Sequence, residues 1–498
     1  MPLYKVKVKW GKEVFPDVEV NTDEVPMVFK AQLFALTGVQ PDRQKVMLKG
    51  VTLKDESWGN LKLKDGATVL LMGSKEELPG EPTEKPVFME DMTESELATA
   101  LDLPAGLTNL GNTCYMNATV QCLRTVPELR DVLRNFQGGI TLAGSMVPSQ
   151  SITAALRDLY ESMDKTATIP PIILLQVLHM AFPRFAEKSE HGGFEQQDAN
   201  ECWTEVMRML QQKLPPVSSL ATSDPSTEGA VSSNSCNFID QYFGGTFDVS
   251  LKCVESDDEK EAESKENFLQ LSCFISQDVK YLHSGLKSRL QETITKYSPT
   301  LNRDAQYQKK SVISRLPAYL TIQFVRFYYK EKGSINAKIL KDVKFPLRLD
   351  AFDLCSKELQ QKLMPMRARF KEQEDKLAEE TQKDKCKEES KRKSPKLTRE
   401  EPFSFPDDPG SNNSGYYDLQ AVLTHRGRSS SSGHYVSWIK RKGDEWFKCD
   451  DDKVSVVTSE EILKLSGGGD WHCAYVLLYG PRILEVEKEE GTEDIEAS

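Results

Sequence analysis

The sequence predicts an α+β protein with more than one domain. Its 498 residues exceed the length of a typical single domain. Strand-like and helix-like patterns both occur, and polar segments at 75–104 and 483–498 interrupt them. We therefore expect an N-terminal domain (1–74), a linker (75–104), a second domain (105–482) and an acidic tail (483–498).

Residues 1–74 are expected to fold in the order ββαββ. Alternating apolar residues on both sides of Gly11 indicate a hairpin. A helix pattern follows and ends at Gly38. Its expected apolar positions are Val28, Leu33, Phe34 and Leu36. Two short strands, 45–48 and 68–72, complete the predicted unit.

Two further segments within 105–482 have the composition of insertions. Residues 215–237 are rich in Ser, Thr, Pro, Gly and Asn, which favours a flexible insertion. Residues 357–401 are dominated by charged residues, with apolar residues at roughly helical spacing. We interpret the second segment as a partly helical, solvated arm rather than a binding element.

Composition argues against several classes of protein. The net charge of −12 and the lack of a basic stripe disfavour nucleic acid as a partner, and suit a substrate that presents basic residues. No run of about 18 apolar residues predicts an integral membrane segment, and residues 1–15 lack the apolar stretch of a secretion signal. We expect a cytoplasmic protein, with the nucleus as a second location. None of the 10 cysteines forms a Cys-x-x-Cys pair, so neither a zinc site nor another cofactor is predicted.

Cys114 is the candidate nucleophile. It follows a polar, glycine-rich loop and stands where a helix pattern begins, with Asn112 or Thr113 as the expected N-cap. One helix face would carry Met116, Val120 and Leu123. The positive end of a helix dipole favours a thiolate. A purely structural cysteine is the alternative, and it is our interpretation of Cys122.

Asn109 lies just upstream of the candidate nucleophile. Its carboxamide can donate a hydrogen bond to a developing oxyanion, together with the backbone N–H of Cys114. An ordinary turn residue is the alternative. Asn109 is therefore a candidate for stabilising the transition state.

His434 is the candidate base because hairpin geometry pairs it with a carboxylate. It begins a strand that turns near Lys442, and a second strand runs to about Asp450. Depending on the turn, His434 faces residue 450 or 451, and residues 450–452 are all Asp. Opposed Cβ atoms lie about 5 Å apart, close enough for an Asp to orient the imidazole. The weaker alternatives for the base are His191 and His425, while His179 is expected to pack on a helix.

Four segments resemble the family of ubiquitin-specific proteases. They are a cysteine box at 106–121, an acidic box at 196–201, a core strand at 316–327 and a histidine box at 417–435. The resemblance covers about 105–482. It implies a papain-like fold of palm, thumb and fingers, with no cofactor. Many members carry a zinc site in the fingers, but this sequence lacks the cysteine pairs for it.

The same resemblance implies roles for individual residues. Cys114 would be the nucleophile, His434 the base, Asp450 the orienting acid and Asn109 part of the oxyanion hole. It favours Asp450 over Asp451, a choice that the hairpin geometry leaves open. The substrates would be ubiquitin and ubiquitin conjugates, cut after the C-terminal Gly of ubiquitin.

Recognition of the ubiquitin tail is assigned to residues in two of these boxes and the core strand. The tail carries arginines, which carboxylates can bind through charge-assisted hydrogen bonds. The candidate substrate-binding residues are Gln197, Asp198, Glu201, Phe327 and Tyr435. Alternatively, the two acids lie on a solvated helix face without a role in binding. The two aromatic residues could equally belong to the protein core.

Residues 1–74 resemble ubiquitin itself, most clearly at 41–50. Met72 is followed by Gly-Ser-Lys rather than a free Gly-Gly end, so an integral ubiquitin-like β-grasp domain is expected. Its outward apolar patch would consist of Met47, Leu70 and Met72. Together the two resemblances imply docking to the regulatory particle of the 26S proteasome.

A serine run next to the base suggests regulation. The candidate regulatory residues are Ser429, Ser430, Ser431 and Ser432. This loop would cover the cleft until a partner moves it, and a phosphate on Ser431 would displace it; a plain flexible loop is the alternative. Two other functions stay open: a non-catalytic ubiquitin-binding adaptor, and a protease for another ubiquitin-like modifier.

Overall fold

The computed structural model describes residues 3–55, 57–59, 61, 63–74, 102–140, 147–189, 192–217, 237–256, 259–330, 335–385, 398–429 and 432–487. The chain divides into two compact units, Met1–Asp91 and Met92–Ser498. Most of the predicted linker, of the insertion at 215–237 and of the acidic tail lies outside the described residues. No helix among the described residues is long and apolar enough to span a membrane.

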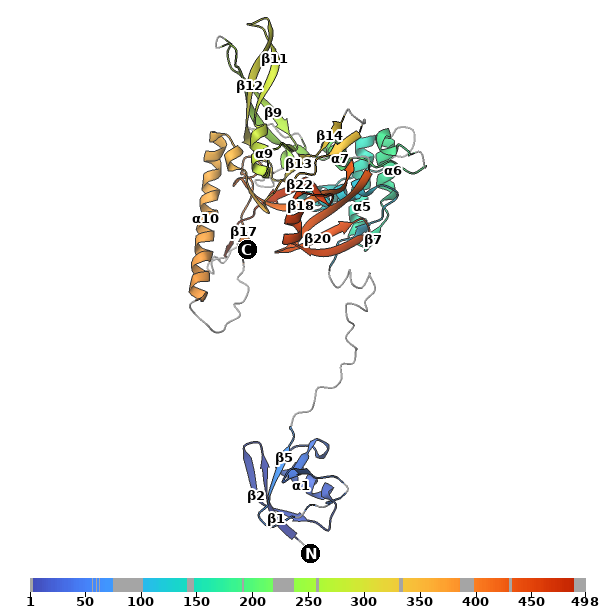
Figure 1. Cartoon of the computed structure of the whole chain (residues 1–498), viewed down its shortest axis with the longest axis vertical. Coiled ribbons are helices and arrows are strands. Elements are labelled where there is room, and N and C mark those ends of the chain that lie inside the picture. Colours follow the sequence, from blue (N-terminus) through green and yellow to red (C-terminus); the bar gives the residue numbers. More distant parts are fainter. Residues whose placement is uncertain are drawn as a thin grey trace, which may run out of the picture. The chain divides into compact units, whose positions relative to one another are not determined.

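The N-terminal unit is a five-stranded sheet with one α-helix, drawn in blue in Figure 1. The strand order is β2-β1-β5-β3-β4, and the central strands β1 and β5 are parallel. The elements are β1 (Leu3–Trp10), β2 (Glu13–Asn21), α1 (Pro26–Thr37), β3 (Lys45–Leu48), β4 (Val51–Thr52) and β5 (Thr68–Met72). The predicted hairpin, helix and two strands are present, and the short strand β4 is an addition to the prediction.

Most of the apolar residues from which the helix α1 was predicted are exposed rather than buried. Leu33 is buried, but Val28, Phe34 and Leu36 are 41%, 40% and 45% exposed. The buried face instead includes Phe29 and Lys30, whose ammonium group pairs with Asp55. Apolar residues occur on both sides of this helix, so periodicity could not show which side faces the sheet. Gly38 ends the helix in a left-handed conformation (φ 73°), as predicted.

The second unit is organised around a ten-stranded sheet. Its main path is β10-β13-β22-β18-β19-β20-β21, and β14, β15 and β16 are attached to it. These strands are β10 (Leu271–Phe274), β13 (Leu320–Val325), β14 (Phe327–Lys330), β15 (Ile335–Lys338), β16 (Arg348–Asp350), β18 (Tyr416–Ser429), β19 (Ser432–Lys442), β20 (Glu445–Asp450), β21 (Lys453–Thr458) and β22 (Cys473–Pro481). The segment predicted as a core strand contains β13.

Helices pack on both faces of this sheet, and on one face α3 lies between the strands and the other helices of that face. Every residue of α3 from Cys114 to Leu123 is buried, whereas the sequence pattern predicted only one buried face. The helices are α3 (Cys114–Arg124), α4 (Pro127–Arg134), α5 (Pro148–Met163), α6 (Ile172–Ala181), α7 (Ala199–Gln211), α8 (Phe238–Phe243), α9 (Leu282–Arg289), α10 (Lys357–Lys385) and α11 (Ser459–Leu463). The position of α3 places its first residue against the sheet.

A separate four-stranded sheet, β11-β12-β8-β9, projects from this body (Figure 1). Its strands are β8 (Gly245–Cys253), β9 (Ala262–Phe268), β11 (Gln291–Ser298) and β12 (Arg303–Arg315). Two small two-stranded sheets complete the unit. They pair β6 (Gly106–Leu107) with β7 (Thr168–Ile169), and β17 (Thr398–Glu400) with β23 (Glu485–Glu487).

The predicted arm at 357–401 is the long helix α10 over its first part. Its first turns are not solvated: Leu359, Leu363 and Phe370 are buried. Arg367 also forms an ion pair with Asp350 at 2.7 Å. The beginning of the arm is therefore attached to the body of the second unit.

Candidate active site

Cys114 is the first residue of α3, and Thr113 is its N-cap, as predicted. The thiol is 2% exposed. Its Sγ accepts hydrogen bonds from Nε2 of Gln196 (3.3 Å) and from the backbone N–H of Tyr435 (3.5 Å). Two N–H donors and the positive end of the helix dipole therefore face the sulfur.

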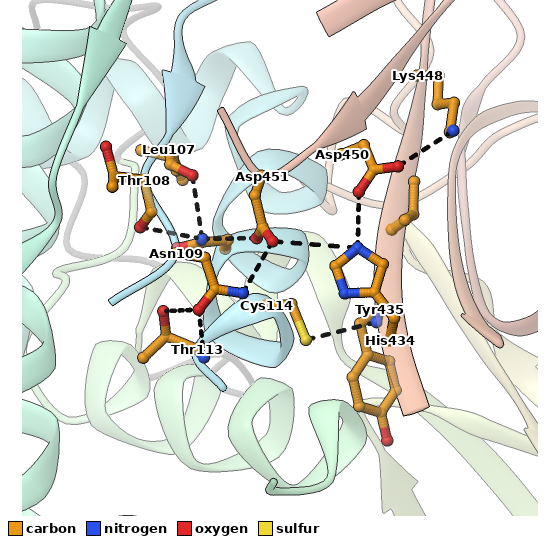
Figure 2. Close-up of polar contacts among 12 residues, drawn as sticks. Leu107, Thr108, Asn109, Thr113, Cys114, His434, Tyr435, Lys448, Asp450 and Asp451 are labelled. Atoms are coloured by element: carbon orange, nitrogen blue, oxygen red, sulfur yellow. Dashed lines mark hydrogen bonds and ion pairs between the residues drawn. The ribbon is translucent and has the colours of Figure 1, made fainter. Parts of the chain in front are cut away.

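His434 belongs to β19 and lies beside Cys114 (Figure 2). Its imidazole contacts a carboxylate. Nε2 lies 2.6 Å from Oδ1 of Asp450. Hydrogen bonds with Asp450 and then with Cys114 raise the pKa of His434 to about 10. His434 lowers the pKa of Asp450, and Lys448, whose Nζ lies 3.1 Å from Oδ2, lowers it further. The structure thus brings together all three members of the predicted triad.

The hairpin register that predicted this contact is wrong in detail. Ser437 faces Cys449, so the same register would place His434 opposite residue 452, not 450 or 451. The difference arises from the turn, which lies between Lys442 and Glu445, about one residue later than predicted; a β-bulge between Lys440 and Lys442 then shifts the register back by one residue. Asp450 therefore reaches His434 diagonally from the same face of the sheet.

Asp451 occupies a different environment from its neighbour. Its Oδ2 accepts a hydrogen bond from Asn109 (2.9 Å) and its Oδ1 accepts one from Asn117 (2.8 Å). It lies 4.0 Å from Nε2 of His434, and burial raises its pKa. Sequence reasoning missed Asn117, although the helical period places it one turn after Cys114.

Asn109 is held firmly by its loop. Its Oδ1 accepts hydrogen bonds from the backbone N–H groups of Gly111 (3.0 Å) and Thr113 (3.2 Å), while Nδ2 donates to Asp451. These contacts fix the amide group near the start of α3 (Figure 2). Its role at an oxyanion stays a prediction.

His434, Asp450 and Asp451 also present atoms within 4.8 Å of one another, a spacing at which three such groups could hold a metal ion. In this structure those atoms contact one another, Asn109 and Asn117. Their chemistry, one imidazole hydrogen-bonded to a carboxylate beside a thiol, is that of a proton-transfer site.

Two residues of the acidic box (196–201) have contacts that the sequence did not predict. Gln196 donates to the Cys114 sulfur, whereas the predicted residue, Gln197, is half-buried nearby in the chain. Asp198 is the N-cap of α7 and also accepts hydrogen bonds from Tyr475, at 2.7 and 2.9 Å. Burial raises the pKa of Asp198. Glu201 is 52% exposed and lies 3.5 Å from Arg184.

The aromatic candidates lie mainly in the core. Tyr435 is 1% exposed, so its side chain does not line an open cleft; the alternative of a core residue is correct here. Phe327 is partly buried and makes edge contacts with His425 and Tyr475, both at 5.2 Å between ring centres. The hydrogen bond of Tyr435 with the nucleophile comes from its backbone N–H.

His425, an alternative base that the structure describes, does not compete with His434 for that role. His425 is fully buried, and burial lowers its pKa to about 3, so it stays neutral. His179 lies on α6, as predicted, and its ring contacts Phe194 at 4.4 Å. His191 lies outside the described residues.

The serine run stands at the tip of the β18–β19 hairpin. Ser429 pairs with Ser432, so both belong to strands rather than to an open loop. Ser430 and Ser431 lie outside the described residues. Gly433 follows with φ 136°, and a Cβ there would lie 2.5 Å from Nε2 of His425. This position next to the base therefore requires glycine.

The predicted outward patch of the N-terminal unit has the expected placement. Met47 and Leu70 face each other across β3 and β5, and both are half-buried. Met72, two residues further on the same face, is 49% exposed.

The site defines a class: a thiol hydrolase with a Cys–His–Asp arrangement. Residues 105–479 match the family model described as "Ubiquitin carboxyl-terminal hydrolase", and the chain belongs to that family. Ubiquitin carboxyl-terminal hydrolase 7 of Arabidopsis thaliana is 42% identical and matches 97% of this chain and 99% of its own. Ubiquitin carboxyl-terminal hydrolase 14 of Caenorhabditis elegans is 42% identical, over 97% and 94%.

A solved structure shares the catalytic fold. It is described as "Structure of the SAGA Ubp8/Sgf11/Sus1/Sgf73 DUB module bound to ubiquitin aldehyde". The TM-score is 0.50 at 22% identity, over 76% of this chain and 69% of that one. The predicted family and catalytic fold are confirmed, and the protein is a cysteine deubiquitinase.

Proposed function

We propose that this deubiquitinase acts at the proteasome in the cytoplasm. It would cleave the isopeptide bond after the C-terminal Gly of ubiquitin and release ubiquitin from conjugates. The observation that carries the catalytic part is the imidazole of His434, which contacts Asp450 at 2.6 Å and whose pKa is raised by both Asp450 and Cys114.

The chemistry follows from these contacts. His434 accepts the thiol proton, and the Cys114 sulfur attacks the carbonyl carbon of the terminal Gly. An oxyanion forms, to which the Cys114 backbone N–H and Asn109 would donate, each contributing roughly 3 kcal/mol. The C–N bond then breaks, and the lysine amine leaves with the proton from His434. Water, deprotonated by His434, hydrolyses the thioester and restores the thiol.

Tail recognition is the part of the proposal that sets the substrate. Two terminal glycines let the tail enter a narrow cleft beside Cys114. Glu201 offers an exposed carboxylate near the start of α7, with Arg184 as its present partner. We assign an arginine of the ubiquitin tail to Glu201 and Asp198, which lie at the same helix start.

A ubiquitin probe with a C-terminal electrophile tests the nucleophile. Wild type should form a covalent adduct, and Cys114→Ala should form none and lose all turnover while still binding ubiquitin. Cys122→Ala removes a buried thiol further along the same helix and should keep the adduct. An adduct with Cys114→Ala would contradict the assignment, and faster labelling by a probe of another modifier would change the substrate.

For the N-terminal unit we propose a ubiquitin-like domain that docks to the regulatory particle through Met47, Leu70 and Met72. The strand order and the outward placement of these residues support it. In the full chain, Leu70→Asp should lose co-sedimentation with 26S proteasomes. Val28→Asp, a matched change at a 41% exposed position on α1, should retain it. Retained binding by Leu70→Asp would place the contact elsewhere.

The tip of the β18–β19 hairpin is proposed as a gate, with Ser431 as its phosphorylation site. The tip adjoins Gly433 and the base, so a displacement there would reach the catalytic strand. Ser431→Glu should raise basal hydrolysis of a ubiquitin reporter, with Ser431→Ala as the control. Equal hydrolysis rates for the two variants would contradict the proposed gate.

A further inference from the structure

A cavity of about 390 Å³ lies at the C-terminal end of α3. Arg124 is ten residues after Cys114, which at 1.5 Å per residue places this end about 15 Å from the nucleophile. The polar residues that line it include Arg124, Arg130, Lys440, Arg441, Gln121 and Gln420. The cavity is therefore separate from the active site, although α3 and β19 contribute to both.

The residues that line this cavity carry positive charge without acidic residues among them to balance it. Four of the lining residues are basic and none is acidic. Arg124 pairs with Asp164, and Arg441 lies 3.3 Å from Glu445. The protein as a whole carries a net charge of −12, so this concentration of cations is a local feature.

Two of the four cations have no counter-ion. Arg130 and Lys440 are half-buried, and neither side chain forms a hydrogen bond or ion pair with any residue that the structure describes. The Nε of Arg130 is also buried without a hydrogen-bond partner. Partly burying an unpaired cation costs free energy, which an anion in the cavity would offset.

We propose that this cavity binds a small soluble ligand that carries two or more phosphate groups. Planar guanidinium groups bind phosphate oxygens in pairs, and Lys440 adds a point charge. Arg130 and Lys440 together match the charge of about one phosphate, and Arg124 and Arg441, whose carboxylate partners are not part of the lining, add donors for a second. The volume lies within the range of about 300–1,000 Å³ for small-molecule sites. Ile439 and Phe447 supply an apolar wall for the carbon skeleton of the ligand.

Calorimetric titration of the full chain in about 150 mM salt tests the proposal. The probes are inorganic phosphate, pyrophosphate and inositol hexakisphosphate. We expect the two polyphosphates to bind at least tenfold more tightly than inorganic phosphate. Arg130→Gln should weaken their binding at least tenfold, and Lys440→Gln should do the same if Arg130→Gln does not fold.

The matched control is Lys265→Gln, which removes one positive charge from a 75% exposed site on β9. It should leave polyphosphate binding within twofold of wild type. The proposal is overturned if neither polyphosphate binds, if inorganic phosphate binds as tightly as they do, or if Lys265→Gln weakens binding as much as the cavity variants.

Discussion

The two ends of α3 differ in how completely their charged groups are paired. At the N-terminal end, the sulfur of Cys114 and the imidazole of His434 have partners among neighbouring side chains. At the C-terminal end, Arg130 and Lys440 have none among the described residues. The first end carries its own reactive groups, whereas the second has room and charge for a group that must come from outside.

The helix dipole acts at both ends but explains only part of this difference. Its positive end lies at Cys114, and its negative end favours Arg124 in the last turn. The dipole does not account for Arg130 on α4 or Lys440 on β19, which other elements bring to the same cavity. The proposed ligand site is therefore the cavity as a whole, where three elements bring four cations together, and not Arg124 alone.

Among substitutions that keep the nucleophile, the largest effect is expected from Asp450→Asn at the paired end. Loss of the carboxylate leaves the imidazole poorly oriented, and kcat/KM should fall about 10³–10⁴-fold, as for comparable triads. The protonated form of His434 gives its proton to the leaving amine and is lost as pH rises through its pKa, about 10. Without Asp450, the main cause of that raised pKa, the alkaline limb of the pH–rate profile should move to lower pH. A profile identical to wild type would contradict this role.

A smaller loss is expected from Asp451→Ala. Its carboxylate holds both Asn109 and Asn117, so its removal should misplace the oxyanion donor and lower kcat by about a hundredfold. The alkaline limb should stay near that of wild type, because Asp450 remains. Movement of the limb instead would show that Asp451 acts on His434 directly. The measurement is the pH dependence of hydrolysis for both variants in parallel.

Asp198 allows charge recognition to be separated from helix capping. Asn is as good an N-cap as Asp, so Asp198→Asn keeps the cap of α7 but loses the charge. If Asp198 reads an arginine of the tail, Asp198→Asn should raise KM about tenfold with little change in stability. Asp198→Ala should also lose about 1 kcal/mol of unfolding free energy. An unchanged KM for Asp198→Asn would leave Asp198 with a structural role only.

The smallest effect is expected at the other end of α3. Arg124 pairs with Asp164, and its side chain is 15% exposed while that of Asp164 is 42% exposed. Arg124→Ala should therefore lower the free energy of unfolding by about 1 kcal/mol, measured by urea denaturation. Asp164→Ala should cost a similar amount, and the double variant should cost less than the sum. Strict additivity would show that the ion pair does not contribute.

Much of the catalytic site could be predicted from the sequence. Cys114 at a helix start and His434 on a strand that leads to Asp450 lie in short continuous segments whose local patterns indicate both structure and chemistry. The His434–Asp450 contact exists despite an incorrect register because Asp450 lies on the same face of the sheet and reaches His434 diagonally. An apolar–polar pattern does not fix the position of a turn to within one residue, and here the turn lies between Lys442 and Glu445.

The remaining features depend on residues that are distant in the chain. Gln196 reaches Cys114 from another element, and Asn117 and Asn109 meet Asp451 only after β20 lies beside α3. Tyr435 is buried, and one side of α1 is exposed, because of the way β19 and α1 each pack against neighbouring elements. Apolar residues alone do not determine this.

By itself, the sequence determined the family and the enzyme class and predicted the nucleophile and the base, because the residues concerned lie in contiguous motifs whose chemistry is local. Only the tertiary structure decided how the neighbouring acids Asp450 and Asp451 divide their contacts, and that α3 ends at a cavity with unpaired cations. Hydrogen bonds and charge balance depend on distances of a few ångströms between separate elements, and packing alone sets those distances.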